Sequence, residues 1–541
     1  MLNVTPIRGN DHHAAAHYFS AADDYYAKEN PGEWQGIGAE SLGLKGAVEQ
    51  VQLARLLDGQ LPNGERIQKT FDRSSKKKRM GLDLTFSAPK SVSMQALVAS
   101  DRTVTLMHDR AVTRALEQVE RLAEARKKVK GKSYRERTGN LVIAKFRHEM
   151  SRAKDPQLHT HSVVFNMTQR SDGAWRALSN EDIFLVRTEI EAIYRTELAM
   201  GLKALGYGIR LVDDKGGFEL AHISRDQIEA FSSRSQVIEA MLADEGKTRA
   251  SASRLEKQII AIATRPRKDE GDRAIVKQYW VEKSRELGID YGENSKLNQF
   301  SYTSRKSGGS GAQDVEGEGS EPARDRAPSV DGTARNIAED RPSVPLASRD
   351  AERSGSTSKN QAAKSGLADS EVAGAGGQNS SAQATLKPVQ IFVQYAIDHL
   401  TEREATVRES ALSAAALQRA VGLAGLSEVR TEIKRLVNQG TLIESMPAYR
   451  IADRKDGLSL SAAGWQNYLG EMKGWSANEA RQYVANAIKQ GSLVPNEKRY
   501  TTQKALKCEK SILAIGCCRS SCCGLGRGRC CCGIGRARER A

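Results

Sequence analysis

Residues 139–168 read GNLVIAKFRHEMSRAKDPQLHTHSVVFNMT, and this stretch decides the predicted fold. Side chains of an extended strand alternate between its two faces, so every second residue shares a face. On one face the first half of the stretch carries Val142, Ala144, Phe146 and His148. Asp155-Pro156 predicts a turn after it. The stretch therefore predicts two adjacent antiparallel strands.

The returning segment alternates in the same way and directs His159 and His161 to one side. Antiparallel pairing would bring them to one spot with His148. Neutral imidazole is a common metal ligand, and three protein ligands with open positions are typical of a catalytic metal site. Each histidine taken singly is more simply a half-buried polar residue on a sheet edge. The His-x-His pair, with a third histidine ending the neighbouring apolar face, favours metal binding.

Length and charge limit the classes of protein that remain. The chain has 541 residues, which suggests about three or four domains. Its formal net charge of +15 favours a polyanionic partner, although a solvated basic face gives the same sum. The sequence lacks an apolar run of about eighteen residues and a signal-peptide pattern at the N-terminus. We therefore expect neither membrane insertion nor export, and a cytoplasmic location.

The cysteines are confined to the C-terminal end. All eight lie at or after Cys508, in a tail that contains CCRSSCCGLGRGRCCCG. Adjacent cysteines match neither Cys-x-x-Cys zinc spacing nor a disulfide framework. We interpret residues 516–541 as an out-of-frame reading that ends the protein prematurely and is disordered. A metal-binding tail is the alternative.

Residues 81–93, GLDLTFSAPKSVS, form a second informative stretch. Leucine and phenylalanine alternate with polar residues, which predicts a strand that ends at Ala88-Pro89. Asp83 lies in mid-strand, where aspartate is disfavoured. It is either at an exposed edge, or it hydrogen-bonds a ligand histidine or accepts a proton from a nucleophile.

Residues 91–127 have a helical pattern, with His108 expected at the surface, and a basic run over residues 126–137 follows it. This run is either a solvated loop or a contact to backbone phosphates. The glycine-lysine pairs at Gly131-Lys132 and Gly246-Lys247 lack the earlier glycine of a nucleotide phosphate loop. We therefore expect no ATP site.

Three tyrosines lie in the alanine-rich segment before residue 30, which predicts helix. Tyr18 and Tyr25 are seven positions apart and share a face on a continuous helix, and Tyr26 lies one step around it. Tyrosines at this spacing are usually core or interface residues. A catalytic role is the alternative.

Composition divides the remainder of the chain. Residues 296–388 are rich in Ser, Gly, Ala, Asp and Arg, too polar to bury a core, and predict a disordered linker of roughly 50 Å root-mean-square span. Residues 389–515 return to helical patterns and predict a small, mainly helical domain that is winged-helix-like.

These motifs together resemble a known family. The resemblance rests on Tyr18, DDYY at 23–26, GEWQG at 32–36, GLDLTFSAPKSVS, GNLVIAKFRHE, DPQLHTHSVVFNMT and DGAWRAL at 172–178. They closely resemble the N-terminal relaxase domain of MobF-class conjugative relaxases, the TraI/TrwC type of HUH endonucleases, over residues 1–295. Residues 386–515 resemble the segment that precedes the helicase motor in these proteins. The helicase phosphate loop should follow residue 514, where the cysteine-rich tail appears, so we expect no helicase activity.

The resemblance implies an α+β fold, an HUH palm with a central antiparallel sheet and helical fingers over bound DNA. It implies nicking of one strand at a plasmid or mobile-element origin of transfer. Tyr18 matches the first, strand-cleaving tyrosine, which forms a 5'-phosphotyrosyl bond; Tyr25 matches the second, and Tyr26 could share its role. Asp83 would accept a proton or hold a ligand histidine.

The resemblance also implies cofactors and partners. His148, His159 and His161 would hold one divalent cation, Mg2+ or Mn2+, and no nucleotide is required. The DNA would be single-stranded or extruded, and accessory relaxosome proteins and a coupling protein are the expected protein partners.

The sequence is also compatible with two other functions. A metal-dependent phosphohydrolase would use the same histidines with water as nucleophile and release a free 5' phosphate. A truncated remnant would bind single-stranded DNA without nicking it.

Overall fold

The computed structural model describes residues 1–9, 11, 13, 15, 32–67, 78–129, 132–248, 251–264, 273–292, 387–452 and 458–511. Three predicted features lie outside these ranges. They are the tyrosines Tyr18, Tyr25 and Tyr26, residues 296–386 of the predicted linker, and the cysteine-rich tail. The described residues all belong to one structural unit. The domain boundaries given above stay predictions.

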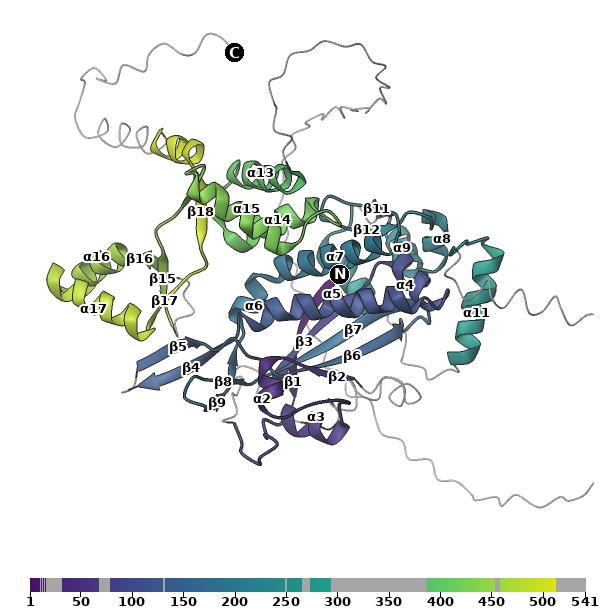
Figure 1. The fold of residues 1–541 in the computed structure, drawn as a ribbon, viewed down its shortest axis with the longest axis horizontal. Helices are drawn as coiled ribbons and strands as arrows, with labels where there is room; N and C mark the ends of the chain where they lie inside the picture. Colours follow the sequence, from purple (N-terminus) through teal and green to yellow (C-terminus); the bar gives the residue numbers. More distant parts are fainter. Residues whose placement is uncertain are drawn as a thin grey trace, which may run out of the picture. The chain divides into compact units, whose positions relative to one another are not determined.

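A five-stranded sheet forms the centre of the N-terminal half (Figure 1). Its order is β1-β3-β7-β6-β2, and every neighbouring pair is antiparallel. The strands are β1 (Leu2–Gly9), β2 (Glu33–Gln35), β3 (Lys78–Ser87), β6 (Ile143–Met150) and β7 (Pro156–Phe165). The predicted antiparallel pair, β6 and β7, and the predicted strand around Asp83 are thus confirmed.

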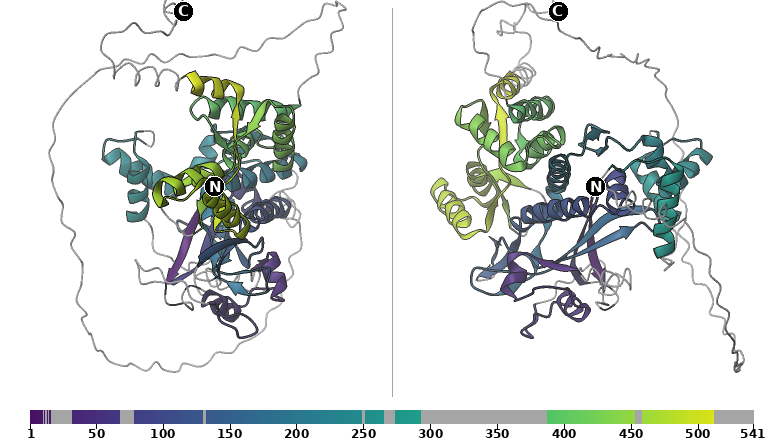
Figure 2. Two further views of the ribbon diagram at one scale, coloured as in Figure 1. Left: turned by 90° about the vertical axis from the view of Figure 1, so that its left-hand side faces the viewer. Right: turned by 45° about the vertical axis from the view of Figure 1, so that its right-hand side comes forward.

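The sheet separates two apolar cores, because each strand sends alternate side chains to opposite faces. One face packs against α4 (Lys90–Leu97), α5 (Arg102–Glu120) and α7 (Arg187–Ala204) (Figures 1 and 2). The other face packs against α3 (Gln50–Leu57), whose leucines join Val142, Ala144, Phe146, Val163 and Phe165 in a second core. The predicted histidines follow the alternation of this second face.

The expected single helix over residues 91–127 is wrong. α4 and α5 are separate helices, because Ser100 has a left-handed backbone (φ 57°) and Asp101 caps a new helix. The Asp101 carboxylate accepts hydrogen bonds from the backbone N–H groups of Thr103 and Val104. The basic run that follows is not a loop. It forms two paired strands, β4 (Glu124–Val129) and β5 (Lys132–Arg137).

Smaller elements complete the N-terminal half. They are α2 (Ile37–Ser41), β8 (Thr168–Gln169), β9 (Trp175–Arg176), β10 (Leu178–Ser179), α6 (Glu181–Leu185), β11 (Ile209–Leu211), β12 (Phe218–Leu220), α8 (Arg225–Ala230), α9 (Ser233–Asp244), α10 (Arg254–Ala263) and α11 (Arg273–Glu286). Among the described residues, no helix combines the length and apolar character needed to cross a bilayer.

The C-terminal segment contains two three-stranded sheets, ordered β13-β18-β14 and β16-β15-β17. Its elements are α13 (Pro388–Thr401), β13 (Val407–Arg408), α14 (Glu409–Arg419), α15 (Leu426–Asn438), β14 (Leu442–Glu444), β15 (Ala448–Ile451), β16 (Ser459–Ser461), α16 (Ala462–Lys473), α17 (Ala477–Gln490), β17 (Leu493–Pro495) and β18 (Arg499–Thr502). Helices α14 and α15 contact the strands of the first sheet, and the winged-helix-like module stays a prediction. The short strands of this segment were not predicted from the sequence.

Phe86 lies in the core between the sheet and helices α5 and α7, so truncating it should cost much stability. This side chain is fully buried, and its ring centroid lies 5.3 Å from that of Tyr194. We expect Phe86→Ala to lower the free energy of unfolding by about 3–5 kcal/mol, measured by urea denaturation. Leu106→Ala removes an exposed side chain of α5 and should change it by less than about 0.5 kcal/mol. Equal losses in the two variants would contradict this assignment of the core.

Candidate metal centre

Three histidines converge on one face of the sheet. β6 carries His148, β7 carries His159 and His161, and the register places His148 opposite His159. One nitrogen from each ring lies within 4.8 Å of the others. The ring centroids are 5.0 to 5.3 Å apart, and all three residues are half-buried. The structure therefore brings together the three ligands predicted from the sequence.

The hydrogen bonds of two of these rings determine which nitrogen is available to a metal. Nδ1 of His161 lies 2.8 Å from Oδ2 of Asp83, and Nδ1 of His159 lies 2.9 Å from the carbonyl oxygen of Gln157. A carbonyl and an ionised carboxylate only accept, so each Nδ1 carries the hydrogen. Nε2 of each ring then keeps its lone pair. This outer hydrogen bond is typical of metal-binding histidines.

The local environment keeps His159 in its neutral form. Burial, together with the neighbouring His161, lowers the pKa of His159 to about 4. Only neutral imidazole has a lone pair for a metal. His159 is thus ready to bind a cation at neutral pH without first losing a proton.

Asp83 lies on β3, the strand that pairs with β7. It is 8% exposed, so the edge position considered above is wrong and the contact to a ligand histidine is the one observed. Thr85, two residues on, lies on the same face. Its Oγ1 is 3.2 Å from both Asp83 Oδ2 and His161 Nδ1. Thr85 was not predicted at the site, although the alternation of the strand places it on the same face as Asp83.

The predicted tyrosines lie outside the described residues, but described residues on both sides limit their reach. Ala15 packs against the apolar core on the histidine face. Trp34, shortly after the undescribed segment, packs against the same core. Tyr18 follows Ala15 by three positions, which is about 10 Å of extended chain.

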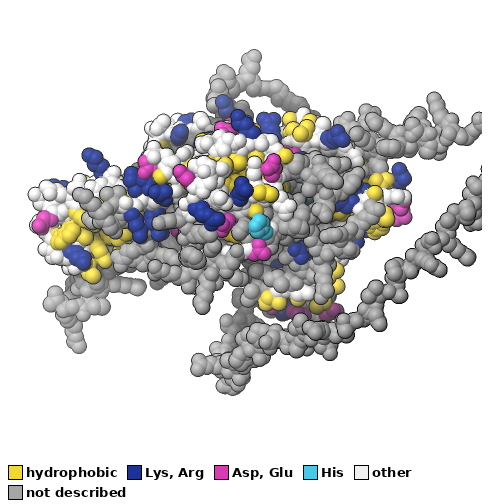
Figure 3. Space-filling view, turned by 90° about the horizontal axis from the view of Figure 1, so that it is seen from below, with side chains coloured by type: hydrophobic (Ala, Val, Ile, Leu, Met, Phe, Trp, Pro, Cys, Tyr) yellow, Lys and Arg dark blue, Asp and Glu magenta, His cyan; other side chains and the backbone are white. Residues whose placement is uncertain are grey.

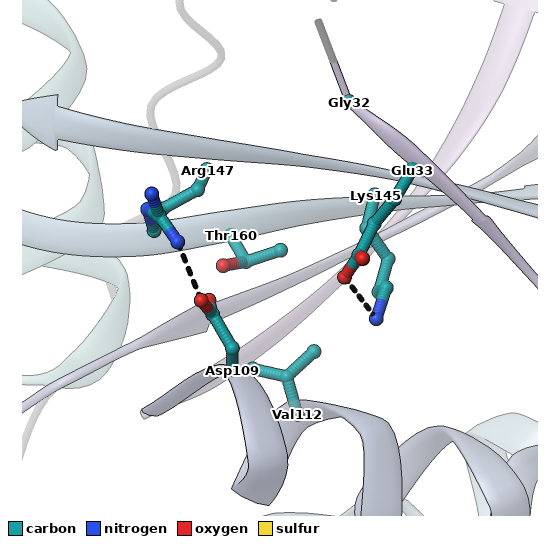
Figure 4. A pocket seen from close by; sticks show the side chains of 7 residues that line it. All are labelled: Gly32, Glu33, Asp109, Val112, Lys145, Arg147 and Thr160. Carbon is teal, nitrogen blue, oxygen red and sulfur yellow. Dashed lines mark hydrogen bonds and ion pairs between the residues drawn. The ribbon is translucent and has the colours of Figure 1, made fainter. Parts of the chain in front are cut away.

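The opposite face of the same strands borders a polar cavity of about 210 Å3 (Figure 4). Two ion pairs lie along it, Arg147 with Asp109 and Lys145 with Glu33. The cavity lining consists of Gly32, Glu33, Asp109, Val112, Lys145, Arg147 and Thr160. Because the charges are paired, the cavity carries no excess of either sign.

The expectation that His108 lies at the surface is wrong. It is fully buried, with Nδ1 2.9 Å from the Tyr194 hydroxyl and Nε2 2.9 Å from the Thr160 hydroxyl. A sequence signal was present, because His108 shares the apolar face of α5. The buried residues of that face include Val104, His108, Ala111, Val112 and Ala115. Burial, with Arg147 nearby, holds the pKa of His108 well below its usual value.

Comparison with known proteins covers the N-terminal half. The family model described as TrwC relaxase matches residues 12–287. The multifunctional conjugation protein TraI of Escherichia coli is 40% identical over 287 residues, which is 51% of this chain and 16% of that protein. TraI of strain K12 is 37% identical over 300 residues, 54% of this chain and again 16% of the relative. The chain therefore matches only about a sixth of these relatives' length.

Solved structures of the conjugative relaxase TrwC are similar over the same half. One, in complex with oriT DNA and metal-bound, is 48% identical with a TM-score of 0.51. Another holds a 27-mer DNA comprising the recognition hairpin and the cleavage site, and is 47% identical with a TM-score of 0.50. Each match covers 54% of this chain and 100% of the solved chain.

The contact between Asp83 and His161 predicts an effect on metal affinity. We expect Asp83→Asn to weaken Mn2+ binding about 10–100-fold, measured by isothermal titration calorimetry, because the neutral amide no longer stabilises the ligand tautomer. Asp101→Asn changes another buried carboxylate and keeps the helix cap, so it should bind Mn2+ as the unaltered protein does. Equal affinity of Asp83→Asn and Asp101→Asn would refute the role of Asp83.

Buried neutral His108 predicts that acid destabilises the metal-free protein. The pKa of His108 is lower in the folded than in the unfolded chain, so unfolding takes up a proton below about pH 6.5. The contribution of neutral His108 to the free energy of unfolding is therefore complete above that pH. Below it, the free energy of unfolding falls by up to about 1.4 kcal/mol per pH unit. His159 adds a loss of the same sign down to about pH 4.

The variant His108→Gln tests this assignment. Between about pH 7 and about pH 5 its unfolding free energy, measured by urea denaturation with EDTA present, should fall less steeply than that of the unaltered protein. Identical slopes would mean that His108 is not the buried group that titrates.

Proposed function

The chain belongs to the TrwC relaxase family, and from this premise we propose that it nicks one DNA strand at an origin of transfer and rejoins it by transesterification. The observation that carries the proposal is the histidine triad, in which Asp83 contacts His161. Residues on both sides of the tyrosine-bearing segment pack against the same face of the sheet. Phosphodiester transfer requires a charge-neutralising centre beside a nucleophile. The chain supplies residues for both.

A divalent metal fits the triad. Three nitrogens within 4.8 Å of one another, two of them with the tautomer fixed by an outer hydrogen bond, are a suitable donor set. When bound, the cation would neutralise the scissile phosphate and orient it. We propose Mg2+ or Mn2+ as the ion that supports activity, although imidazoles alone favour softer metals.

Tyr18 is the proposed first nucleophile. Its phenolic oxygen loses its proton and attacks the phosphorus, and the bond from phosphorus to the 3' oxygen breaks. The leaving 3' oxygen takes up a proton and becomes a free 3' hydroxyl. The product is a 5'-phosphotyrosyl DNA end. Because one phosphodiester replaces another, the reverse reaction rejoins the strand without a nucleotide. Tyr25, or Tyr26 beside it, is the proposed nucleophile for the strand transfer that ends a round.

Asp83 has two possible roles, and its contacts favour one of them. Its hydrogen bond to His161 supports the role of holding a ligand histidine. Phenol has a pKa near 10, so the tyrosine also needs help to ionise at neutral pH. We propose that Asp83 contributes to that help through His161, one of the three residues that would hold the cation.

The proposed substrate is single-stranded or extruded DNA at the origin of transfer, because the tyrosine must approach one backbone in line. Lys and Arg side chains lie at several places on the face viewed from below, with Asp and Glu among them (Figure 3), and the net charge of +15 suits a polyanion. Accessory relaxosome proteins, a coupling protein, a cytoplasmic location and the lack of helicase activity stay predictions.

A covalent adduct tests the proposed chemistry. The full chain is incubated with Mg2+ or Mn2+ and an oligonucleotide that carries the nick site, and the products are separated on a denaturing gel. We expect a protein–DNA adduct that Tyr18→Phe abolishes and Tyr26→Phe retains, because only the first tyrosine attacks the intact strand.

The other functions give different products. A phosphohydrolase would release a free 5' phosphate, form no adduct and be indifferent to Tyr18→Phe. A DNA-binding remnant would shift the oligonucleotide on a native gel without cutting it. Either pattern would refute the proposed transesterification.

A further inference from the structure

Helix α5 makes three polar contacts with β6 and β7, on the face of the sheet opposite the three histidines. His108 contacts Thr160, Asp109 pairs with Arg147, and Thr113 Oγ1 accepts a hydrogen bond from Lys145 at 3.0 Å. We call these six residues the polar seam. Figure 4 shows four of them, with Thr160 and Arg147 directed toward the helix and Lys145 toward Glu33.

The seam alternates with the metal ligands along the strands. Thr160 lies between His159 and His161 on β7, and Arg147 immediately precedes His148 on β6. Since successive side chains point to opposite faces, the seam residues face α5 while the histidines face the site. Thr160 and Arg147 are also cross-strand partners. Each ligand is therefore next in sequence to a residue that α5 holds.

His108 occupies the most enclosed position of the seam. It is fully buried, and both ring nitrogens have partners at 2.9 Å, the hydroxyls of Tyr194 on α7 and Thr160 on β7. Tyr194 is fully buried and Thr160 is 3% exposed. A neutral imidazole has one donor and one acceptor, so the chain from Tyr194 through His108 to Thr160 has every ring position satisfied. Such a network rigidifies its members, because a broken link leaves a buried polar group unpaired.

We propose that His108 is a positioning residue for the metal centre, which fixes the backbone of the His159-Thr160-His161 segment through Thr160 and is itself fixed by Tyr194. This inference rests on the proposed metal site. Apolar packing alone would hold the strand against α5 but would not fix Thr160 in one orientation. Ligand sets bind well only when they are held to within about 0.5 Å of the productive geometry. The link between α7 and β7 thus determines metal affinity without touching the metal.

The test compares variants that differ by single polar groups. Thr160→Val removes the hydroxyl that His108 contacts, and Thr160→Ser restores it. Tyr194→Phe removes the hydroxyl on the other side of the ring. As a matched control, Tyr291→Phe removes the hydroxyl of another buried tyrosine, which is bonded to Ser284 3.1 Å away. Mn2+ binding to each full-length variant is measured by the loss of the free-ion electron paramagnetic resonance signal, alongside urea denaturation.

The expected result is about tenfold weaker Mn2+ binding in Thr160→Val and Tyr194→Phe, at the low end for residues that orient metal ligands. Thr160→Ser and Tyr291→Phe should bind within about twofold of the unaltered protein, although Tyr291→Phe loses a comparable buried bond. Nicking by Thr160→Val should recover at high Mn2+ concentration, since the ligands themselves are intact.

Two negative outcomes have different meanings. If the unaltered protein binds Mn2+ and loses it in His159→Ala, but Thr160→Val and Tyr194→Phe bind normally, the positioning role is refuted and the metal site stands. If the unaltered protein binds no Mn2+, the metal site fails first. Equal loss of affinity in Tyr291→Phe would show that general destabilisation is the cause, and would also overturn the positioning role.

Discussion

The register between β6 and β7 is the constraint on which the site depends. His148 lies opposite His159, and Phe146 lies opposite His161, so all three imidazoles fall on one face. A shift of one residue in either strand would turn its histidines toward α5. The register is strongly specified because both faces are buried: Val163 and Phe165 belong to one core, Leu158 and Val164 to the other. Core packing therefore protects the ligand geometry.

The two faces of the sheet use their side chains for different purposes. The histidine face combines an apolar core with half-buried polar ligands, supported by Asp83 and Thr85. The other face packs α5 with both apolar contacts and polar ones, of which the fully buried contacts at His108 are the most costly to disrupt. The candidate metal ligands and the residues of both cores thus share the same strands.

The parts of the fold with a clear period could be predicted from sequence. Alternation over residues 142–148 and 158–165 predicted the paired strands, and the same period predicted the strand of Asp83. The break between α4 and α5 was missed because it depends on a local feature, the cap at Asp101, inside a continuous helical pattern. Burial of His108 was missed because its partners, Tyr194 and Thr160, come from distant segments. The C-terminal strands are too short to show the alternation of polar and apolar residues that identifies a strand.

The pairing of the sheet also determines the order in which its parts can assemble. Of its four pairings, only that of β6 with β7 joins strands that are neighbours along the chain. The others join Leu2 to Phe86, Asp83 to Val163 and Glu33 to Lys145. Hairpins close in about 1–10 μs, whereas distant pairings pay the entropy of a long loop. All three histidines lie in that single hairpin, so they can come together early, whereas the contacts from Asp83 and α5 that orient them form only when the more distant segments join.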